Sequence, residues 1–219
     1  MHQGHPRFFS LEGVDGSGKT TQIVLLLEKL KSLGYETLSV REPGGNPVSD
    51  QIRKLLLDPA NKIDPTTELL LYSAARAQLV SQVIEPALAA GKVVIADRFG
   101  WSTLAYQGYG RNLDHKKISE LFTIACGAIW PCHSFLLDIP IASMRARILA
   151  EGRPADRMEN ENAAFFERVR NGYLQIAQNN TDRFTLLDGA QPKAFLQEKI
   201  SQKIIHQLSV QSIENFSGN

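Results

Sequence analysis

The feature that most constrains this chain is a glycine-rich segment after an apolar run near its start. The segment reads Gly13-Val-Asp-Gly-Ser-Gly-Lys-Thr-Thr21, and Gly13, Gly18, Lys19 and Thr20 match the pattern GxxxxGK[ST]. An amphipathic run follows, which gives the strand–loop–helix context in which this pattern cradles phosphate. Glycines let backbone N–H groups turn toward a phosphate, and the helix start adds partial positive charge. The candidate ATP-binding residues are Gly13, Asp15, Gly16, Ser17, Gly18, Lys19, Thr20 and Thr21.

Two residues are predicted to serve the metal that accompanies a nucleotide. The hydroxyl of Thr20 can bind Mg²⁺. Asp97 ends the apolar run Val93–Ala96, so its carboxylate is expected beside the phosphate loop, where it can hold Mg²⁺ directly or through water. Lys19 is predicted to bridge the β- and γ-phosphates.

Strands and helices are predicted to alternate along the chain. The expected strands are Phe8–Leu11, Glu36–Val40, Val93–Ala96, Ser134–Leu137 and Phe184–Leu187, and the expected helices are Gln22–Leu33, Ser49–Leu57, Glu68–Ala90, Lys116–Cys126, Ile141–Ala150 and Glu161–Gln178. This alternation predicts a parallel sheet covered by helices on both faces. We therefore expect one domain over residues 1–219, a P-loop α/β/α three-layer fold with a five-stranded parallel sheet. Its ligands should lie beyond the carboxyl ends of the strands.

Composition excludes several classes of protein. Lys and Arg total 24 against 23 Asp and Glu, so net charge gives no reason to expect a nucleic acid or a membrane surface as partner. The two cysteines, Cys126 and Cys132, are too few for a disulfide framework and are expected to be reduced and structural. The polar N-terminus lacks a signal-peptide core, and no apolar stretch is long enough for a membrane span. A cytoplasmic location is expected.

Two short strings resemble motifs of GTP-hydrolysing proteins. Asp97–Gly100 fits DxxG and Asn61–Asp64 fits NKxD, but the second string precedes the first and does not follow a strand. We interpret Asn61–Asp64 as a turn before Pro65. The phosphate loop by itself does not identify the group that accepts the phosphoryl.

Four sequence blocks together resemble those of bacterial thymidylate kinases. They are residues 8–21 (FFSLEGVDGSGKTT), 41–45 (REPGG), 97–107 (DRFGWSTLAYQ) and 153–159 (RPADRME), in the order found in that family. The resemblance spans residues 8 to about 190. It implies transfer of the γ-phosphoryl group of Mg-ATP to dTMP for dTTP synthesis, an NMP-kinase-like fold with a short lid, and a homodimer. ATP and dTMP are then the expected partners.

The resemblance also assigns residues to the phosphate and sugar of dTMP. Arg98 is expected to grip the phosphate, for which its forked guanidinium is suited. The family usually has Tyr or His in the next position, where this chain has Phe99. Asp15 is expected to meet the 3′-hydroxyl. Tyr106 is expected near the sugar, where it disfavours a 2′-hydroxyl, and Ser102 shares its helix face.

Further residues are expected around the base. Pro43 forms one wall of the thymine pocket, and Glu42 resembles a family carboxylate near the metal and phosphates. Tyr72 and Arg76 lie one helical turn apart, so the ring can stack on thymine while the guanidinium binds its polar edge. Thr103 and Gln107 are candidates for contact with the base edge or the phosphate.

Catalysis is expected to need a cation rather than a base. The phosphate of dTMP has a second pKa of about 6 and is already a nucleophile near pH 7. One subgroup of the family carries a basic residue in the phosphate loop, where this chain has Gly16. The arginine-rich lid, about residues 145–160, is therefore expected to supply the cation. Arg153 is the first candidate and Arg147 the second, beside Lys19 and Arg98 as the other catalytic candidates.

Other readings of the sequence remain open. A nucleoside kinase on the same scaffold would use Glu42 as a general base, and another nucleoside-monophosphate kinase would hold a different base. A regulator could bind ATP without turnover. The tail after about Gln207, residues 208–219, is predicted to be a frayed extension.

Overall fold

The fold is a parallel sheet between two helical layers. The computed structural model describes residues 4–217, with side-chain environments described to residue 210. The five strands are β1 (His5–Glu12), β2 (Thr37–Arg41), β3 (Val93–Asp97), β4 (Pro131–Asp138) and β5 (Phe184–Asp188). They lie in the order β2-β3-β1-β4-β5, and all neighbours are parallel. The predicted parallel sheet and all five of its strands are confirmed.

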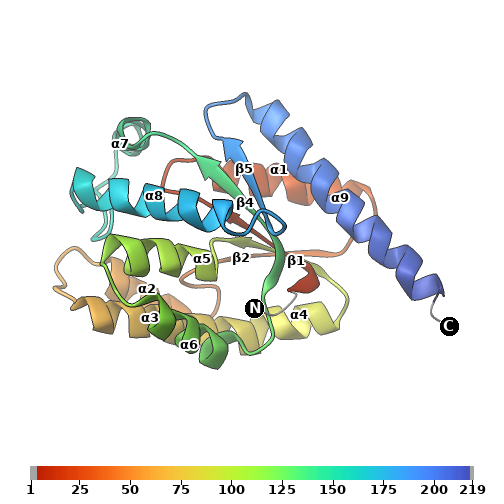
Figure 1. The fold of residues 1–219 in the computed structure, drawn as a ribbon, viewed down its shortest axis with the longest axis horizontal. Coiled ribbons are helices and arrows are strands. Elements are labelled where there is room, and N and C mark those ends of the chain that lie inside the picture. The colour runs from red at the N-terminus through yellow and green to blue at the C-terminus, as the bar shows by residue number, and fades with distance from the viewer. Residues whose placement is uncertain (1–3, 218–219) are drawn as a thin grey trace.

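Eleven helical segments lie between or after the strands within the described residues. They are α1 (Lys19–Ser32), α2 (Pro47–Leu57), α3 (Pro65–Leu79), the π-helical η1 (Val80–Ile84), α4 (Glu85–Ala89), α5 (Gly100–Thr103), the π-helical η2 (Leu104–Gly110), α6 (His115–Cys126), α7 (Ile141–Ala150), α8 (Ala163–Gln178) and α9 (Lys193–Ser217). Apolar residues of α1 and α9 pack on one sheet face. The helices from α3 to α6 and α8 pack on the other face. Figure 1 shows this layered arrangement.

The helix predicted over Glu68–Ala90 has an irregular middle. Its centre is the π-helical η1, followed by Pro86 at the start of α4. Proline has no N–H for the regular α-helical ladder and its ring clashes with the preceding turn, so a wider turn accommodates it.

Two helices were not predicted as elements. Residues Gly100–Gly110 form α5 and η2, although the spacing argument for Ser102 and Tyr106 assumed a helix there. The second is α9, whose buried residues recur every fourth position as Leu196, Ile200, Ile204 and Leu208. This helix extends to Ser217, and Leu208, at the start of the predicted tail, packs in the core at 2% exposure. The fraying of the tail stays a prediction. Residues 218–219 of that tail lie outside the described chain.

The parallel arrangement brings the strand ends to one edge. Leu11 and Arg41 are both in register with Asp97, and Glu12 is in register with Leu136. The loops after β1, β2 and β3 therefore emerge side by side. No helix of the described chain is long and apolar enough to cross a bilayer.

Candidate active site

The phosphate loop connects β1 to α1 and needs glycine for steric reasons. Gly13 has φ +134°, and a Cβ there would lie 2.5 Å from the carbonyl oxygen of Leu137. Gly16 has φ +68°, and a Cβ there would lie 3.1 Å from the Cβ of Arg147. Both positions combine a left-handed backbone with a close neighbour, so only glycine fits without rearrangement.

Lys19 is turned back onto its own loop. Its ammonium donates to the carbonyl oxygens of Gly13 at 3.1 Å and Val14 at 3.0 Å. The side chain is buried at the first turn of α1, and burial lowers the Lys19 pKa to about 8. The cation therefore lies at the loop, where a triphosphate would meet it.

The two predicted metal residues are in direct contact. The Thr20 hydroxyl donates to Oδ2 of Asp97 at 2.7 Å. Hydroxyl and carboxylate oxygens are the hard ligands that Mg²⁺ prefers, and it usually takes only one or two carboxylates from a protein. The described residues contain no cluster of three or more His, Cys, Asp or Glu that could form a protein-only cage. This donor set fits Mg²⁺ held jointly with phosphate and water.

Two adjoining hollows lie at this edge of the sheet. The wide cavity has about 590 Å³ and includes, among the predicted residues, Asp15, Gly16, Gly18, Lys19, Thr20, Thr21, Asp97, Arg98, Arg147 and Arg153. The narrow pocket has about 80 Å³ and includes all ten predicted acceptor residues, Asp15, Glu42, Pro43, Tyr72, Arg76, Arg98, Ser102, Thr103, Tyr106 and Gln107. Asp15, Glu42 and Arg98 line both hollows.

Two predicted nucleotide residues do not line the wide cavity. Ser17 is buried at 1% exposure within the loop. Gly13 contributes its carbonyl oxygen, which accepts from Lys19 and from Nη1 of Arg98 at 2.6 Å. These residues shape the loop from behind.

Arg98 lies where the two hollows meet. Its backbone has φ +70°, an uncommon conformation for a residue with a side chain. Nη2 donates to Oδ1 of Asp15 at 2.7 Å, and the guanidinium lies 5.1 Å from the centre of the Tyr106 ring. Burial alone would raise the Asp15 pKa, but the charges of Arg98 and Lys19 outweigh it and lower the pKa to about 2. Asp15 is therefore an anion that helps to hold Arg98 in place.

Glu42 lines the wide cavity together with Thr20 and Asp97. Both of its carboxylate oxygens accept from Nε of Arg76, at 3.0 and 2.8 Å. Its expected place near the metal and phosphates stays a prediction. Burial raises the Glu42 pKa, and Arg76 opposes this rise. Nη2 of Arg76 donates to the Thr103 hydroxyl at 2.6 Å. The remaining nitrogen, Nη1, is buried and has no hydrogen-bond partner among the residues that the structure describes.

Glu68 is a buried anion behind the narrow pocket that sequence analysis did not single out. Its carboxylate, at 0% exposure, accepts from Gln107 Nε2 at 2.8 Å and from Arg111 at 3.0 and 2.9 Å. Nη1 of Arg157 forms an ion pair with it at 2.7 Å. Burial would raise the Glu68 pKa, but the hydrogen bonds from Arg111 and Gln107 outweigh it and lower the pKa.

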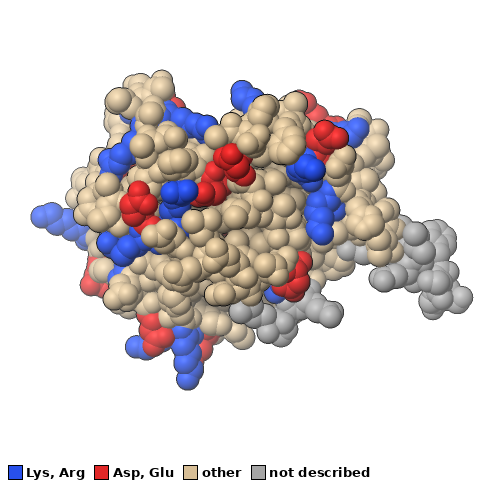
Figure 2. All heavy atoms as spheres, turned by 45° about the horizontal axis from the view of Figure 1, so that its top comes forward, with Lys and Arg blue, Asp and Glu red and all other residues tan. Residues whose placement is uncertain are grey.

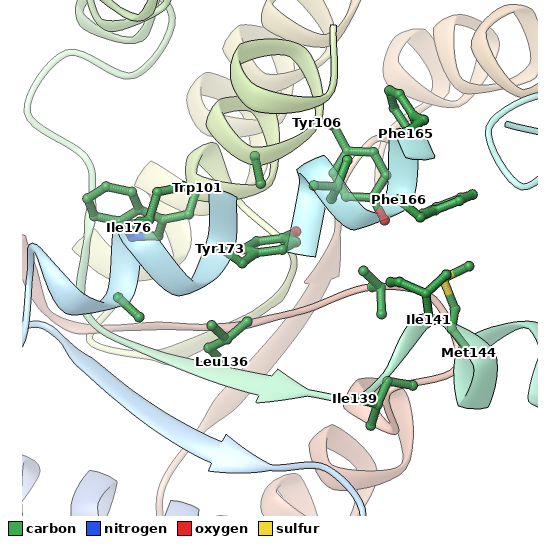
Figure 3. Close-up of a cluster of buried hydrophobic side chains, with 14 of the residues drawn as sticks. Trp101, Tyr106, Leu136, Ile139, Ile141, Met144, Phe165, Phe166, Tyr173 and Ile176 are labelled. Atoms are coloured by element: carbon green, nitrogen blue, oxygen red, sulfur yellow. The ribbon is translucent and has the colours of Figure 1, made fainter. Parts of the chain in front are cut away.

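Ser102 lies at the pocket wall but its hydroxyl is engaged elsewhere. It donates to Oε2 of Glu12 at 2.6 Å and lies 2.6 Å from the Tyr173 hydroxyl. Nη1 of Arg98 also donates to this tyrosine at 3.0 Å. Figure 3 shows Tyr173 on α8 and Tyr106 on η2 in the apolar cluster that joins the two helices. Burial raises the Glu12 pKa to about 7.

The lid arginines occupy three different positions. Arg147 on α7 donates from Nη1 to the carbonyl oxygen of Gly16 at 2.8 Å, so it touches the phosphate loop. Arg153 pairs with Glu151 at 2.8 Å and Glu159 at 2.5 Å and is 46% exposed. Arg157 forms an ion pair with Glu68 and does not line the wide cavity.

Arg53 is a further cation that sequence analysis missed. It lines both hollows from α2, and its Nη1 donates to the carbonyl oxygen of Pro43 at 2.8 Å. Burial, followed by the neighbouring Arg41, lowers the Arg53 pKa. A single arginine on an amphipathic helix reads as a solvated surface residue, so only the fold reveals its position.

Charged residues of both signs mix on the molecular surface. Figure 2 shows Lys and Arg side chains interspersed with Asp and Glu on one face, without a broad area of a single sign. Six cations instead line the wide cavity, namely Lys19, Arg41, Arg53, Arg98, Arg147 and Arg153. Such an arrangement suits a small polyanion bound in a hollow.

Comparisons with known proteins agree with this geometry. The family model described as thymidylate kinase matches residues 11–200. A curated thymidylate kinase of Geobacter sulfurreducens is 49% identical over 188 residues, covering 83% of this chain and 88% of the relative. That of Caldanaerobacter subterraneus is 42% identical over 211 residues and covers 96% of each. The crystal structure of thymidylate kinase from Ehrlichia chaffeensis superposes with a TM-score of 0.73 at 31% identity, covering 90% of this chain and 97% of that one.

Proposed function

Because the chain belongs to the thymidylate kinase family and phosphorylates dTMP to dTDP with ATP, we propose that the reaction takes place where its two hollows meet. The wide cavity holds the triphosphate of ATP against the phosphate loop. The narrow pocket holds dTMP, with its phosphate toward Arg98. The residues shared by both hollows then lie between donor and acceptor.

One observation carries the assignment of the narrow pocket to thymine. Nη1 of Arg76 is a buried donor without a partner, in a pocket that also contains the amide of Gln107. A buried donor left unpaired costs about 1–3 kcal/mol, so a ligand acceptor that pairs with it gains affinity. The O4 atom of thymine is such an acceptor. Tyr72 and Pro43, in the same pocket, provide the flat surfaces for the ring.

The chain's own residues align the reaction and balance its charge. An oxygen of the dTMP phosphate forms a bond to the γ-phosphorus, and the bond from that phosphorus to the β-bridging oxygen breaks, which releases ADP. Lys19, Arg98 and a lid arginine neutralise the charge that spreads over the transferred group. Asp15 orients Arg98 and accepts from the 3′-hydroxyl of dTMP. Tyr106, near the sugar, disfavours a 2′-hydroxyl.

Mg²⁺ is the proposed cofactor. The contact between Thr20 and Asp97 supports a site for it at the base of the wide cavity. Thr20 and Asp97 would hold the ion, which would neutralise part of the charge on the triphosphate.

We also propose a homodimer in the cytoplasm. Large apolar side chains are exposed on α2, α3 and α6, namely Leu55 at 46%, Leu70 at 51% and Ile124 at 80%. Exposed apolar side chains on neighbouring helices favour a protein interface. The free thiols of Cys126 and Cys132 suit a reducing compartment.

A nucleoside kinase remains the alternative that the sequence left open. It would need a carboxylate to remove a proton from the substrate hydroxyl. Glu42, the candidate base, has both oxygens engaged by Arg76, and this contact disfavours such a role.

The test is ADP production from Mg-ATP with dTMP, dUMP, UMP, CMP, AMP, GMP and thymidine as acceptors. We expect dTMP to lead, dUMP to be weaker and thymidine to be inert. If ADP production is fastest with thymidine, the result would instead support the nucleoside kinase. If it is fastest with another monophosphate, the result would reject the thymine pocket.

A further inference from the structure

We propose that Glu68 determines base specificity without touching the substrate, because it fixes which end of the Gln107 amide faces the narrow pocket. The inference rests on the proposed binding of dTMP in that pocket. Glu68 is a positioning residue in this scheme, and Gln107 is the residue that reads the base.

The first observation is the placement of Glu68 on α3. Glu68, Tyr72 and Arg76 follow one another at four-residue spacing, so all three lie along one face of the helix. Tyr72 and Arg76 line the narrow pocket, whereas Glu68 lies behind it at 0% exposure. The helix thus presents two pocket residues and one buried supporting carboxylate.

The second observation is the set of groups around Glu68. Arg111 donates to both carboxylate oxygens, at 3.0 and 2.9 Å, and Arg157 lies 2.7 Å from Oε2. Two guanidinium groups at these distances keep the carboxyl ionised. An ionised carboxylate can only accept hydrogen bonds.

This chemistry decides the orientation of the neighbouring amide. The Gln107 atom that lies 2.8 Å from Oε1 of Glu68 must be the nitrogen, because an amide oxygen there would place acceptor against acceptor. The amide oxygen is then the acceptor that Gln107 retains for the pocket it lines. The orientation follows from the charge of Glu68 and does not depend on the substrate.

The orientation gives the narrow pocket a directional pattern. Arg76 contributes the unpaired donor Nη1, and its Nη2 donates to Thr103, one turn before Gln107 on η2. A donor beside an acceptor matches thymine, in which the acceptor O4 is next to the donor N3–H. Cytosine has an amino donor at position 4 and an acceptor at N3. Its amino group would therefore face the Arg76 donor, and its N3 would face the amide oxygen of Gln107. Unpaired polar groups in a closed site are the usual source of strong discrimination.

The test compares dTMP with 5-methyl-dCMP, which keeps the methyl group and sugar phosphate and differs only at ring positions 3 and 4. The readout is the ratio of kcat/KM for the two substrates. In Glu68→Gln the new side-chain amide at position 68 can donate as well as accept a hydrogen bond. The Gln107 amide is then free to flip, which exchanges the positions of its oxygen and its nitrogen. We expect the ratio to fall at least tenfold.

Glu161→Gln is the matched control, because Glu161 pairs with Arg111 at 2.6 Å and makes no contact with Gln107 among those recorded for the described residues. Its ratio should stay within about twofold, because Arg111 keeps its hydrogen bonds to Glu68.

A second variant covers the case in which Glu68→Gln fails to fold. Glu68→Asp keeps the charge that Arg111 and Arg157 require but withdraws the carboxylate from Gln107 by one methylene. We expect its ratio to fall in the same direction. An unchanged ratio in the folded Glu68 variants would overturn the proposal.

A double-mutant cycle separates positioning from a general structural effect. Gln107→Met removes the amide and should itself lower the ratio. Adding Glu68→Gln or Glu68→Asp to Gln107→Met should lower the ratio no further, because Glu68 acts through Gln107. Additive losses would show an independent role and reject the proposal. If the unaltered enzyme does not prefer dTMP to 5-methyl-dCMP, the proposed function fails instead.

Discussion

Arg98 combines an unusual backbone with an engaged side chain. Its own N–H donates to the carbonyl oxygen of Leu11, and the next N–H, of Phe99, donates to Oε1 of Glu12. These two bonds hold a left-handed residue directly after β3. A conformation of this kind costs about 1–3 kcal/mol and persists only where its surroundings determine it. The end of β1 thus sets the position of Arg98, the residue proposed to bind the phosphate of dTMP.

The Tyr173 hydroxyl is expected to hold the Arg98 guanidinium in position by accepting a hydrogen bond from it. Tyr173→Phe keeps the ring but removes the acceptor of the 3.0 Å bond from Nη1. A bond to a charged group contributes about 1.5–3 kcal/mol, so we expect KM for dTMP to rise by about tenfold or more with little change for ATP. Steady-state kinetics with each substrate varied gives the answer. Tyr35→Phe, in the turn between α1 and β2, is the control, and an unchanged KM for dTMP in Tyr173→Phe would contradict the argument.

The two lid candidates can be separated by substitution. Sequence analysis ranks Arg153 first, but Arg147 contacts the phosphate loop while Arg153 is held by two carboxylates. We therefore expect the larger loss of kcat, about 10²-fold or more, for Arg147→Ala. Arg145→Ala, on the same helix, should have little effect because its Nη2 donates to the carbonyl oxygen of Glu161. A larger loss for Arg153→Ala would favour a lid that rearranges when nucleotide binds.

Residues in short motifs were predictable, and residues that act through distant partners were not. All ten acceptor candidates line the narrow pocket. Eight of them belong to a block that carries its chemistry locally, and the other two, Tyr72 and Arg76, share one face of a helix. Glu12 and Glu68 were missed. Their partners Ser102 and Gln107 lie 90 and 39 positions away, and only the fold joins them.

At the scale of elements, apolar runs predicted every strand but not where each begins and ends. The run Ser134–Leu137 is the centre of β4, which extends from Pro131 to Asp138. The extension includes His133, a polar residue at 1% exposure whose Nε2 lies 2.8 Å from the Thr185 hydroxyl on β5. Pairing with a neighbouring strand allows a polar residue inside the sheet, which hydrophobicity alone does not predict.

His133 should make stability depend on pH. Burial, then Lys203, lowers its pKa to about 4, while in the unfolded chain the pKa is about 6.5. Between these values the unfolded chain binds more protons than the native protein. The free energy of unfolding should therefore rise with pH from about 4 to 6.5, by up to about 3 kcal/mol from this residue.

Urea unfolding of the unaltered protein and of His133→Gln at several pH values isolates this contribution. The facing charges of Lys203, Asp182 and Arg183 are the same in both proteins. The difference in unfolding free energy between them should change across pH 4–6.5 and be constant above. Parallel curves over the whole range would refute the prediction.

At the scale of the whole molecule, the two helical layers differ in role. The layer of α1 and α9 closes one sheet face with aliphatic side chains. The opposite layer contributes Tyr72, Arg76 and Gln107 to the narrow pocket and also carries the exposed Leu70 and Ile124. The proposed interface and the narrow pocket therefore share the helix α3, against which α6 packs.

The homodimer is testable by charge insertion. A glutamate at an apolar interface would be buried without a partner, which opposes association. Leu70→Glu combined with Ile124→Glu should convert a dimer to a monomer in sedimentation velocity experiments. Phe195→Glu, on α9 in the other layer, should leave the dimer intact. A monomer before any substitution would rule the homodimer out.

The polar groups of the phosphate loop satisfy one another. Lys19 is bound by two carbonyl oxygens of the loop, Thr20 by Asp97, and Arg147 by the Gly16 carbonyl. Any anion that enters must exchange these internal contacts for its own, and its affinity is the difference between the two sets. Free orthophosphate can replace only some of them, whereas a metal-bound triphosphate can replace them together. We therefore expect the loop to discriminate against small anions such as orthophosphate and to favour the triphosphate of ATP, which is proposed to bind here.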